Sequence, residues 1–280
     1  MTGTDKAFTS YDIHACLYDV RRVELFQRAI QETVRPGDIV VDAGSGTGLL
    51  GMLAAKAGAK KVYCVEINNE FVPVIEEHAR RNGFADRIEA ICADATTVAL
   101  PEHVDVIISE VISAGFFYEP HLQILDNLRK YLKPKGSIIP LAMENWIELI
   151  DAQEELYGLR FNYDSRFTPL DGDMSLTGKV SYLQADFHEG TESYIARDVT
   201  VRADQSGPAN ALRITYRIRF TETLESDQPT DFLLNPEIIF LPTPVVLDKG
   251  EDYNVSIGYY ASSAPLSATI DIRPATEMTW

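Results

Sequence analysis

The sequence predicts an α/β protein in which a mostly parallel sheet is followed by an antiparallel β-barrel or sandwich. Over residues 39–140, short apolar runs alternate with helical segments of about ten to fifteen residues, which is typical of right-handed crossovers in a parallel sheet. Beyond residue 142, strand-like segments follow one another with Gly, Pro, Asp and Ser between them. We therefore expect two domains, 1–142 and 143–280.

Each element of the first half is assigned from its own residues. Apolar, β-type runs predict buried strands, and segments with apolar residues at helical spacing predict helices. Gly83 ends the second helix in the position that a helix C-cap prefers. The expected strands are 38–44, 61–68, 87–95, 104–110 and 134–140, and the expected helices are 49–58, 69–83 and 122–132.

The second half contains several segments that alternate apolar and polar residues, such as "RITYRIRF". This alternation predicts strands with one buried face and one solvated face. The less regular stretch 156–175 is expected to be a loop or a helical insertion. The expected strands are 145–152, 179–187, 197–203, 211–220, 245–250, 253–260 and 268–273.

The composition excludes several classes of protein. Apolar residues make up 45% of the chain and charged residues 24%, as in soluble globular proteins rather than disordered or membrane ones. The N-terminal residues do not resemble a secretory signal, and no apolar run is long enough for a spanning helix. Three widely separated cysteines are expected to be reduced thiols. We expect a cytoplasmic protein that does not bind membranes.

The acidic charge is concentrated in the second half. Residues 1–140 carry 15 basic and 19 acidic side chains, a net of −4, and residues 141–280 carry 10 and 23, a net of −13. Such a field repels nucleic acid and favours basic partners, although surface acidity can also serve solubility alone. We expect a basic small molecule or peptide as partner, and no nucleic acid.

A glycine-rich loop joins the first strand to the first helix. The run "VDAGSGTG" contains Gly44, Gly46 and Gly48, which allow a tight turn and a close approach of the backbone to a ligand. Their G-x-G-x-G spacing differs from the G-x-G-x-x-G that binds a pyrophosphate, and no Walker-type Gly-Lys-Ser/Thr follows. We place the three glycines and the preceding Asp42 in a candidate cofactor site.

Two carboxylates follow the next two strands. Glu66 closes the second strand, where an acid can accept hydrogen bonds from both hydroxyls of a ribose. Asp94 follows the third strand, where a carboxylate can accept from an adenine amino group. Either acid alone could be a solvated strand end. Together with the glycine loop they indicate a nucleoside-containing ligand without a pyrophosphate, bound at the carboxyl ends of the strands.

At this point the sequence resembles a known family. The run "VDAGSGTGLLGMLAAKAGAKKVYCVEIN" is similar to the S-adenosylmethionine-binding core of class I methyltransferases, and most similar to that of the protein arginine methyltransferases. The resemblance implies a Rossmann-like domain followed by a β-barrel, S-adenosylmethionine as cofactor and S-adenosylhomocysteine as product. "YDIHACLYDVRR" resembles the family's lid helix, which places Tyr11 at the cofactor and Arg22 where an arginine would hold the methionine carboxylate.

The stretch "SEVISAGFFYEP" resembles the family's double-glutamate loop, with Glu110 and Glu119 at the same spacing. Methyl transfer from a sulfonium to a guanidinium brings two cations together, and nearby carboxylates offset their repulsion. Bidentate pairing would also orient the guanidinium. We predict Glu110 and Glu119 as the catalytic pair. The alternative for Glu119, which precedes Pro120, is a carboxylate at a helix N-terminus.

The chain also departs from the family. After the first glutamate it has Val-Ile-Ser where the family has Trp-Met-Gly, and "DFLLNP" stands in place of the family's Thr-His-Trp loop. The segment after "ELIDA" is shorter than the family's dimerisation arm, although a homodimer is still expected. We predict a methyltransferase that acts on a guanidinium or amine nitrogen without a metal. The alternatives are a small-molecule methyltransferase with a non-guanidine acceptor and a catalytically silent S-adenosylmethionine-binding scaffold.

Overall fold

The first half of the chain folds around a five-stranded parallel sheet. The computed structural model describes residues 10–161, 164–190 and 192–275, with side chains from residue 13 onward. The strand order is β3-β2-β1-β4-β5, and all neighbours run parallel. The bounds are β1 Ile39–Ala43, β2 Lys61–Glu66, β3 Ile88–Cys92, β4 Val104–Ser109 and β5 Leu132–Ile139.

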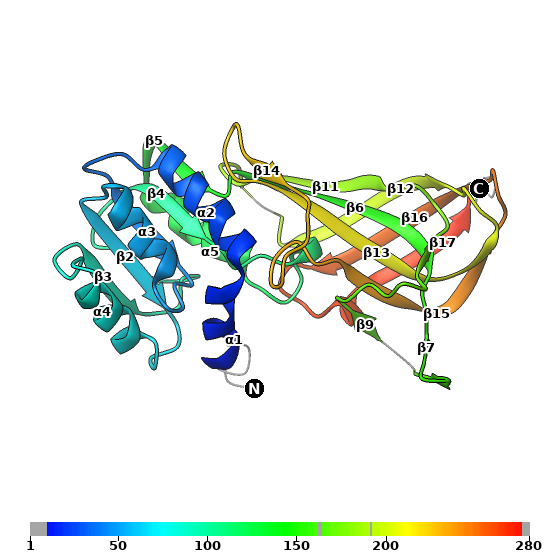
Figure 1. The fold of residues 1–280 in the computed structure, drawn as a ribbon. Helices are drawn as coiled ribbons and strands as arrows, with labels where there is room; N and C mark the ends of the chain where they lie inside the picture. Colours follow the sequence, from blue (N-terminus) through cyan, green and yellow to red (C-terminus); the bar gives the residue numbers. More distant parts are fainter. Residues whose placement is uncertain (1–9, 162–163, 191, 276–280) are drawn as a thin grey trace.

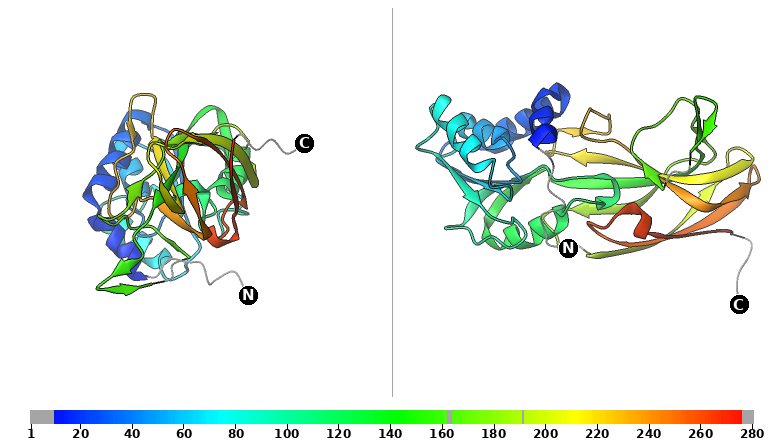
Figure 2. Two further views of the ribbon diagram at one scale, coloured as in Figure 1. Left: turned by 90° about the vertical axis from the view of Figure 1, so that its right-hand side faces the viewer. Right: turned by 90° about the horizontal axis from the view of Figure 1, so that it is seen from below.

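Helices cover both faces of this sheet. Figure 2 shows α2 to α4, in blue to cyan, on one face and α5, in green, on the other. Each helix turns its apolar side to strands such as β1, whose Val40, Val41 and Ala43 are completely buried. No helix in the described part of the chain has the length and apolarity needed to cross a membrane. The bounds are α1 Ser10–Ala15, α2 Val20–Thr33, α3 Leu49–Ala57, α4 Val72–Arg81 and α5 His121–Leu128.

The strand order reverses next to β1. The chain moves from β1 outward to β2 and β3 and then returns to the other side of β1 as β4. Open α/β sheets bind ligands at such a switch point, beyond the carboxyl ends of the strands. The glycine loop after β1 and Glu110 after β4 both lie at this point.

The second half consists of antiparallel sheets arranged around a common interior, as the end-on view in Figure 2 shows. One sheet has the order β10-β6-β13-β15-β9, with β11 also paired to β6 and β14 to β13, and a second has the order β12-β16-β17. The long strands are β6 Ala142–Asp151, β11 Val180–Asp186, β12 Tyr194–Arg202, β13 Gly207–Arg219, β15 Glu237–Leu247, β16 Asp252–Tyr260 and β17 Thr269–Pro274. The short ones are β7 Glu155–Leu156, β8 Leu159–Arg160, β9 Ser165–Arg166, β10 Met174–Ser175 and β14 Glu225–Ser226.

The two halves share one hydrophobic core. Phe26 of α2 packs edge-to-face on Phe220, which follows β13, with ring centroids 5.1 Å apart. Phe117, between the two predicted glutamates, stacks on Tyr259 of β16 at 4.3 Å. The loop between the glutamates is therefore held between the parallel sheet and the antiparallel half.

Three predicted elements differ from the structure. The expected lid helix is divided at Asp19, which caps α2 and separates it from α1. The stretch 156–175 forms part of a β7–β8 hairpin and the short strands β9 and β10, and its described residues contain no helix. The strand predicted at 245–250 begins much earlier, at Glu237, because β13 and β15 lose their regular register between Phe240 and Val245 and so accommodate Pro242 and Pro244.

Candidate active site

The glycine loop adopts a backbone conformation that requires glycine. Gly44, Gly46 and Gly48 have φ angles of +76°, +52° and +79°. A Cβ atom on Gly44 would lie 2.6 Å from Cγ2 of Val111, which follows Glu110. The loop after β1 and the loop after β4 are thus in direct contact, and a side chain at position 44 would push them apart.

Asp42 supports this loop from the interior. Its side chain is 1% exposed, and its Oδ2 accepts a hydrogen bond of 2.9 Å from the backbone N–H of Gly51 in α3. Burial raises the pKa of Asp42 to about 7. The structure gives Asp42 a role in joining β1 to α3, and its direct contact with a cofactor stays a prediction.

Glu66 also contacts the glycine loop. Its Oε2 accepts from the N–H of Gly46 at 2.7 Å, and its Oε1 accepts from the N–H of Asn68 at 2.8 Å. Each carboxylate oxygen has a second lone pair, so both can still accept a ribose hydroxyl. The carboxylate is thus fixed beside the glycine loop, and its role as a ribose ligand stays a prediction.

Asp94 lies at the end of the neighbouring strand and is exposed. Its Oδ1 accepts from the N–H and the hydroxyl of Thr96, at 2.8 and 2.7 Å. Tyr11 is part of α1, but its side chain lies outside the described residues. The assignments of Asp94 and Tyr11 to the cofactor site therefore stay predictions.

Arg22 points from the first turn of α2 toward the end of β4. Its Nη1 donates to Oε2 of Glu110 at 2.5 Å, and its Nη2 donates to the carbonyl of Cys16 at 2.8 Å. Its buried Nε donates to no described residue. Arg22 is only 5% exposed, so the predicted cofactor ligand and the predicted acceptor ligand form one buried ion pair.

The pKa of Glu110 reflects two opposing effects. Burial raises the pKa of this carboxyl, and the Arg22 guanidinium lowers it, with burial the larger effect. The side chain keeps about 18% of its surface exposed. The carboxylate of Glu110 is therefore partly accessible to a ligand.

Glu119 lies close to Glu110 and Arg22, and its carboxylate accepts no hydrogen bond from a described residue. Burial first, and the negative charge of Glu110 second, raise the pKa of Glu119 to about 8. The residue that caps α5 is Pro120, and no side chain makes a capping hydrogen bond there. Glu119 thus makes no capping hydrogen bond, but it directly precedes α5, and the alternative of a carboxylate at this helix N-terminus stays open.

The loop between the glutamates is positioned by residues that the sequence analysis did not identify. Asn145 of β6 is completely buried, and its Oδ1 accepts from the N–H of Gly115 at 2.9 Å. Gly115 has a φ of +62°, and a Cβ atom there would lie 2.9 Å from the ring of Phe117. The strict alternation of Met143, Asn145 and Ile147 in the sequence could have indicated an inward-facing amide.

A second unidentified residue, Asp19, links α2 to the antiparallel half. Its Oδ2 accepts from the hydroxyl of Thr230 at 2.5 Å and from the N–H of Phe232 at 3.0 Å, and its Oδ1 accepts from the N–H of Arg22 at 3.1 Å. Leu234 in the same loop donates its N–H to the hydroxyl of Tyr216 at 2.7 Å. The segment 230–234, which overlaps the "DFLLNP" stretch predicted to stand in place of the Thr-His-Trp loop, is thereby held against the helix that carries Arg22.

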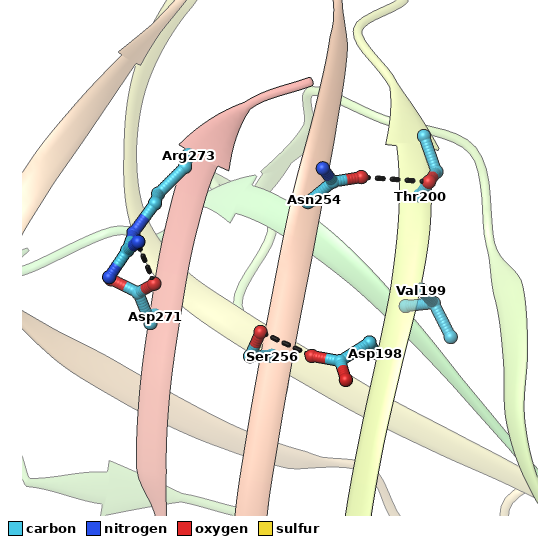
Figure 3. A pocket seen from close by; sticks show the side chains of 7 residues that line it. All are labelled: Asp198, Val199, Thr200, Asn254, Ser256, Asp271 and Arg273. Carbon is cyan, nitrogen blue, oxygen red and sulfur yellow. Dashed lines mark hydrogen bonds and ion pairs between the residues drawn. The ribbon is translucent and has the colours of Figure 1, made fainter. Parts of the chain in front are cut away.

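A surface hollow of about 340 Å³ lies away from this site, on the outer face of the sheet β12-β16-β17 (Figure 3). Its polar groups pair with one another across neighbouring strands or along one strand: Ser256 with Asp198, Thr200 with Asn254 at 2.9 Å, and Arg273 with Asp271 at 2.6 Å. These polar groups already have hydrogen-bond or ion-pair partners on the sheet surface. The part of the chain that the structure describes holds no group of three His, Cys, Asp or Glu side chains arranged for a metal.

Comparison with protein families identifies the kind of domain that contains these residues. A family model described as "Methyltransferase domain" matches residues 40–136, which include the glycine loop, Glu66, Asp94 and both predicted catalytic glutamates. Residues 40–136 form a class I, S-adenosylmethionine-dependent methyltransferase domain. It is similar to the protein arginine methyltransferases.

Among curated relatives, the methyltransferase is 29% identical to an uncharacterized protein of Methanocaldococcus jannaschii, over 85% of this chain and 87% of that protein. It is 36% identical to the histone-arginine methyltransferase CARMER of Anopheles gambiae, over 44% of this chain but only 20% of that protein. The match to the arginine methyltransferases therefore covers only a minor part of their length.

Among solved structures, the methyltransferase is similar to the Trypanosoma brucei PRMT1 enzyme-prozyme heterotetrameric complex with AdoHcy. The TM-score is 0.75 at 20% sequence identity, and the match covers 92% of this chain and 95% of that one. At this identity the similarity establishes the fold, including the antiparallel second half, and not the acceptor.

Proposed function

We propose that the enzyme transfers the methyl group of S-adenosylmethionine to a guanidinium or amine nitrogen held by Glu110 and Glu119. The observation that carries this proposal is the carboxylate of Glu119, which is partly buried, accepts no hydrogen bond from a described residue and lies close enough to Glu110 to be affected by its charge. A guanidinium would supply the missing donors and neutralise the charge. The glycine loop, Glu66 and Asp94 would bind the cofactor next to it.

In this arrangement the cofactor supplies the electrophilic methyl group, and the protein supplies orientation and electrostatics. The positively charged Arg22 and the negatively charged Glu110 would lie between the methionine part of the cofactor and the acceptor. Glu119 would hold the acceptor so that one nitrogen faces the methyl group. Both carboxylates would offset the repulsion between the acceptor cation and the sulfonium.

The test is incubation with methyl-labelled S-adenosylmethionine and a panel of arginine peptides, free arginine and small amines. We expect label on a guanidinium or amine nitrogen, with kcat/KM reduced at least roughly 100-fold by Glu119→Gln. Glu251→Gln makes the same charge change at an exposed turn and should leave the rate unchanged. Label found only on an acceptor without a basic nitrogen would refute the proposal.

A second candidate is a small-molecule methyltransferase with a non-guanidine acceptor. The observation that favours it is the segment 230–234, which Asp19 and Tyr216 hold in place and which contains neither His nor Trp. The same panel, extended with neutral metabolites, distinguishes the two. A silent scaffold would show S-adenosylhomocysteine binding without transfer to any member of the panel.

We also propose a homodimer, supported by the β7–β8 hairpin that projects from the antiparallel half (Figure 1). Tyr157 and Leu159 on this hairpin are 95% and 62% exposed, which is unusual for large apolar side chains. Light scattering coupled to gel filtration should show a dimer that becomes a monomer in the double variant Tyr157→Ser, Leu159→Ser. A monomeric wild-type protein at all concentrations would contradict the assembly.

A further inference from the structure

A third carboxylate lies on the inner wall of the antiparallel half, in contact with the loop that carries Glu119. Glu237 is the first residue of β15 and is 4% exposed. Its partner across the sheet is Ile214 of β13, and Ile214 is paired in turn with Ile147 of β6. Both isoleucines are completely buried, and residues opposite one another point to the same face. Glu237 therefore faces an apolar interior, where an acid is unusual.

The loop that carries Glu119 also contacts Glu237. The hydroxyl of Tyr118, the residue before Glu119, lies 3.5 Å from Oε1 of Glu237 and 3.4 Å from the hydroxyl of Ser165. Tyr118 is 44% exposed, whereas Glu237 is 4% exposed. The partly exposed side chain of Tyr118 thus reaches the buried third carboxylate through its hydroxyl.

Tyr216 connects Glu237 to the other two acids. It is two residues beyond Ile214 on β13, on the same face and closer to the parallel sheet. Burial is the main cause of the raised pKa of Tyr216, and the negative charges of Glu119 and Glu110 contribute further. Two residues of a strand span roughly 7 Å. Glu237 is paired with Ile214, so it lies roughly 7 Å farther from the parallel sheet than Tyr216. Tyr216 is the residue whose pKa both loop glutamates raise.

The charge of Glu237 has no cationic partner among the described residues. Its hydrogen bonds are with the hydroxyls of Tyr118 and Ser165, and its pKa is raised chiefly by burial. Arg166, the neighbour of Ser165, pairs instead with Asp173 and lies over the ring of Phe240. A buried carboxylate with only hydroxyl partners is costly, and a cation from a ligand would reduce that cost.

We propose that Glu237 is a second cation subsite, so that the preferred acceptor is a small dication with its guanidinium at Glu110 and Glu119 and a second ammonium at Glu237. This inference rests on the proposed function, because it takes the guanidinium clamp as the first subsite. Tyr118 closes over the second ammonium and can contact it through its hydroxyl and its ring. The net charge of −13 in residues 141–280 favours the approach of such an acceptor.

The experiment compares 4-aminobutylguanidine, which carries two positive charges, with its N-acetyl derivative, which keeps the guanidinium and the spacer but carries one. The wild-type enzyme should methylate the dication with a kcat/KM at least about tenfold higher, as expected for one charge-assisted hydrogen bond. Glu237→Gln should reduce the dication to the level of the acetylated compound and leave the acetylated compound within about twofold of wild type. Glu251→Gln, an equal change of charge at an exposed turn, should leave the preference intact.

Binding of both compounds to the complex with S-adenosylhomocysteine, measured by calorimetry, separates this inference from the proposed function. Equal kcat/KM and equal affinity for the two compounds would overturn the second subsite and leave the guanidinium clamp standing. A preference in binding that Glu237→Gln removes, without any transfer, would support the subsite and overturn the proposed reaction. Absence of both binding and transfer would overturn both. The comparison of the two compounds on the wild-type enzyme needs no variant to fold.

Discussion

The guanidinium of Arg22 and the carboxylate of Glu110 form an ion pair of 2.5 Å between the first turn of α2 and the end of β4. Both groups are largely buried, so the pair is strengthened by the low dielectric and fixes the geometry of each partner. Arg22, which is predicted to bind the cofactor, and Glu110, which is predicted to bind the acceptor, thus neutralise each other's charge. A ligand carboxylate that reaches Arg22 would change the ionisation of Glu110.

Arg22→Met should weaken binding of S-adenosylhomocysteine, because the variant removes the cation that faces the amino-acid part of the ligand. Loss of a charge-assisted hydrogen bond predicts a loss of about 10- to 100-fold in affinity. 5′-Methylthioadenosine, which lacks the carboxylate, should bind wild type and variant equally. Calorimetry measures both ligands. An equal loss for both would show that Arg22 acts through the fold rather than through the carboxylate.

The rate should increase with pH because Glu119 must be ionised to hold a guanidinium. With a pKa of about 8, the carboxyl is mostly protonated at pH 7 and mostly ionised at pH 9. The facing groups that influence this ionisation are Glu110, whose negative charge raises the pKa of Glu119, and Arg22, whose guanidinium lowers it. We expect kcat/KM to rise roughly tenfold between pH 7 and 9. A flat wild-type profile, measured with an acceptor that stays cationic, would contradict this role.

Asp42→Asn should alter how stability depends on pH. The pKa of Asp42 is about 7 in the folded protein and 3.8 ordinarily, so the unfolded chain releases the proton first. Stability therefore falls as pH rises from about 4 to about 7, by an amount on the order of 4 kcal/mol for this group. The asparagine side chain can still accept the hydrogen bond from the N–H of Gly51, but it does not ionise. The free energy of unfolding of the variant should therefore not fall between about pH 4 and about pH 7. Urea unfolding at pH 4.5 and 7.5 measures it, with the exposed Asp86→Asn as control.

Asp19→Ala should destabilise the fold by about 3 kcal/mol, because it removes a helix cap and two hydrogen bonds to the segment 230–234. Asp19→Asn preserves the cap and should cost less. Thr230→Val removes only one of these bonds. In a double-mutant cycle measured by urea unfolding, Asp19→Ala and Thr230→Val should show a coupling of about 1 kcal/mol. Strict additivity would mean that the 2.5 Å contact makes no net contribution.

The parallel sheet could be predicted from the sequence because its inner strands β2, β1 and β4 are buried on both faces and appear as apolar runs followed by Gly, Asp or Glu. The glycine loop, Glu66 and Glu110 could be placed at one edge for the same reason, since parallel strands end on the same side. The curated and structural comparisons confirm the fold and the methyltransferase class. The individual site assignments stay predictions.

The inner wall of the antiparallel half could not be predicted in the same way. Asn145, Tyr216 and Glu237 belong to three strands far apart in the sequence, and only the register of β6, β13 and β15 brings them together. The start of β15 was obscured by Pro242 and Pro244, which lie in the irregular part of its pairing. The ion pair of Arg22 with Glu110 likewise depends on the break at Asp19, which sets the direction of α2.

The helix α2 is fastened to the antiparallel half at both ends. Asp19 binds the segment 230–234, while Glu32 accepts hydrogen bonds of 2.7 and 2.9 Å from the hydroxyls of Thr221 and Thr223. Its middle buries Phe26 against Phe220. A chain shortened to its parallel-sheet half would leave two carboxylates without their donors and an aromatic ring in water. The two halves are consequently not interchangeable modules, and a transplanted acceptor half would need a Thr-x-Thr turn and a Thr230 equivalent to match this helix.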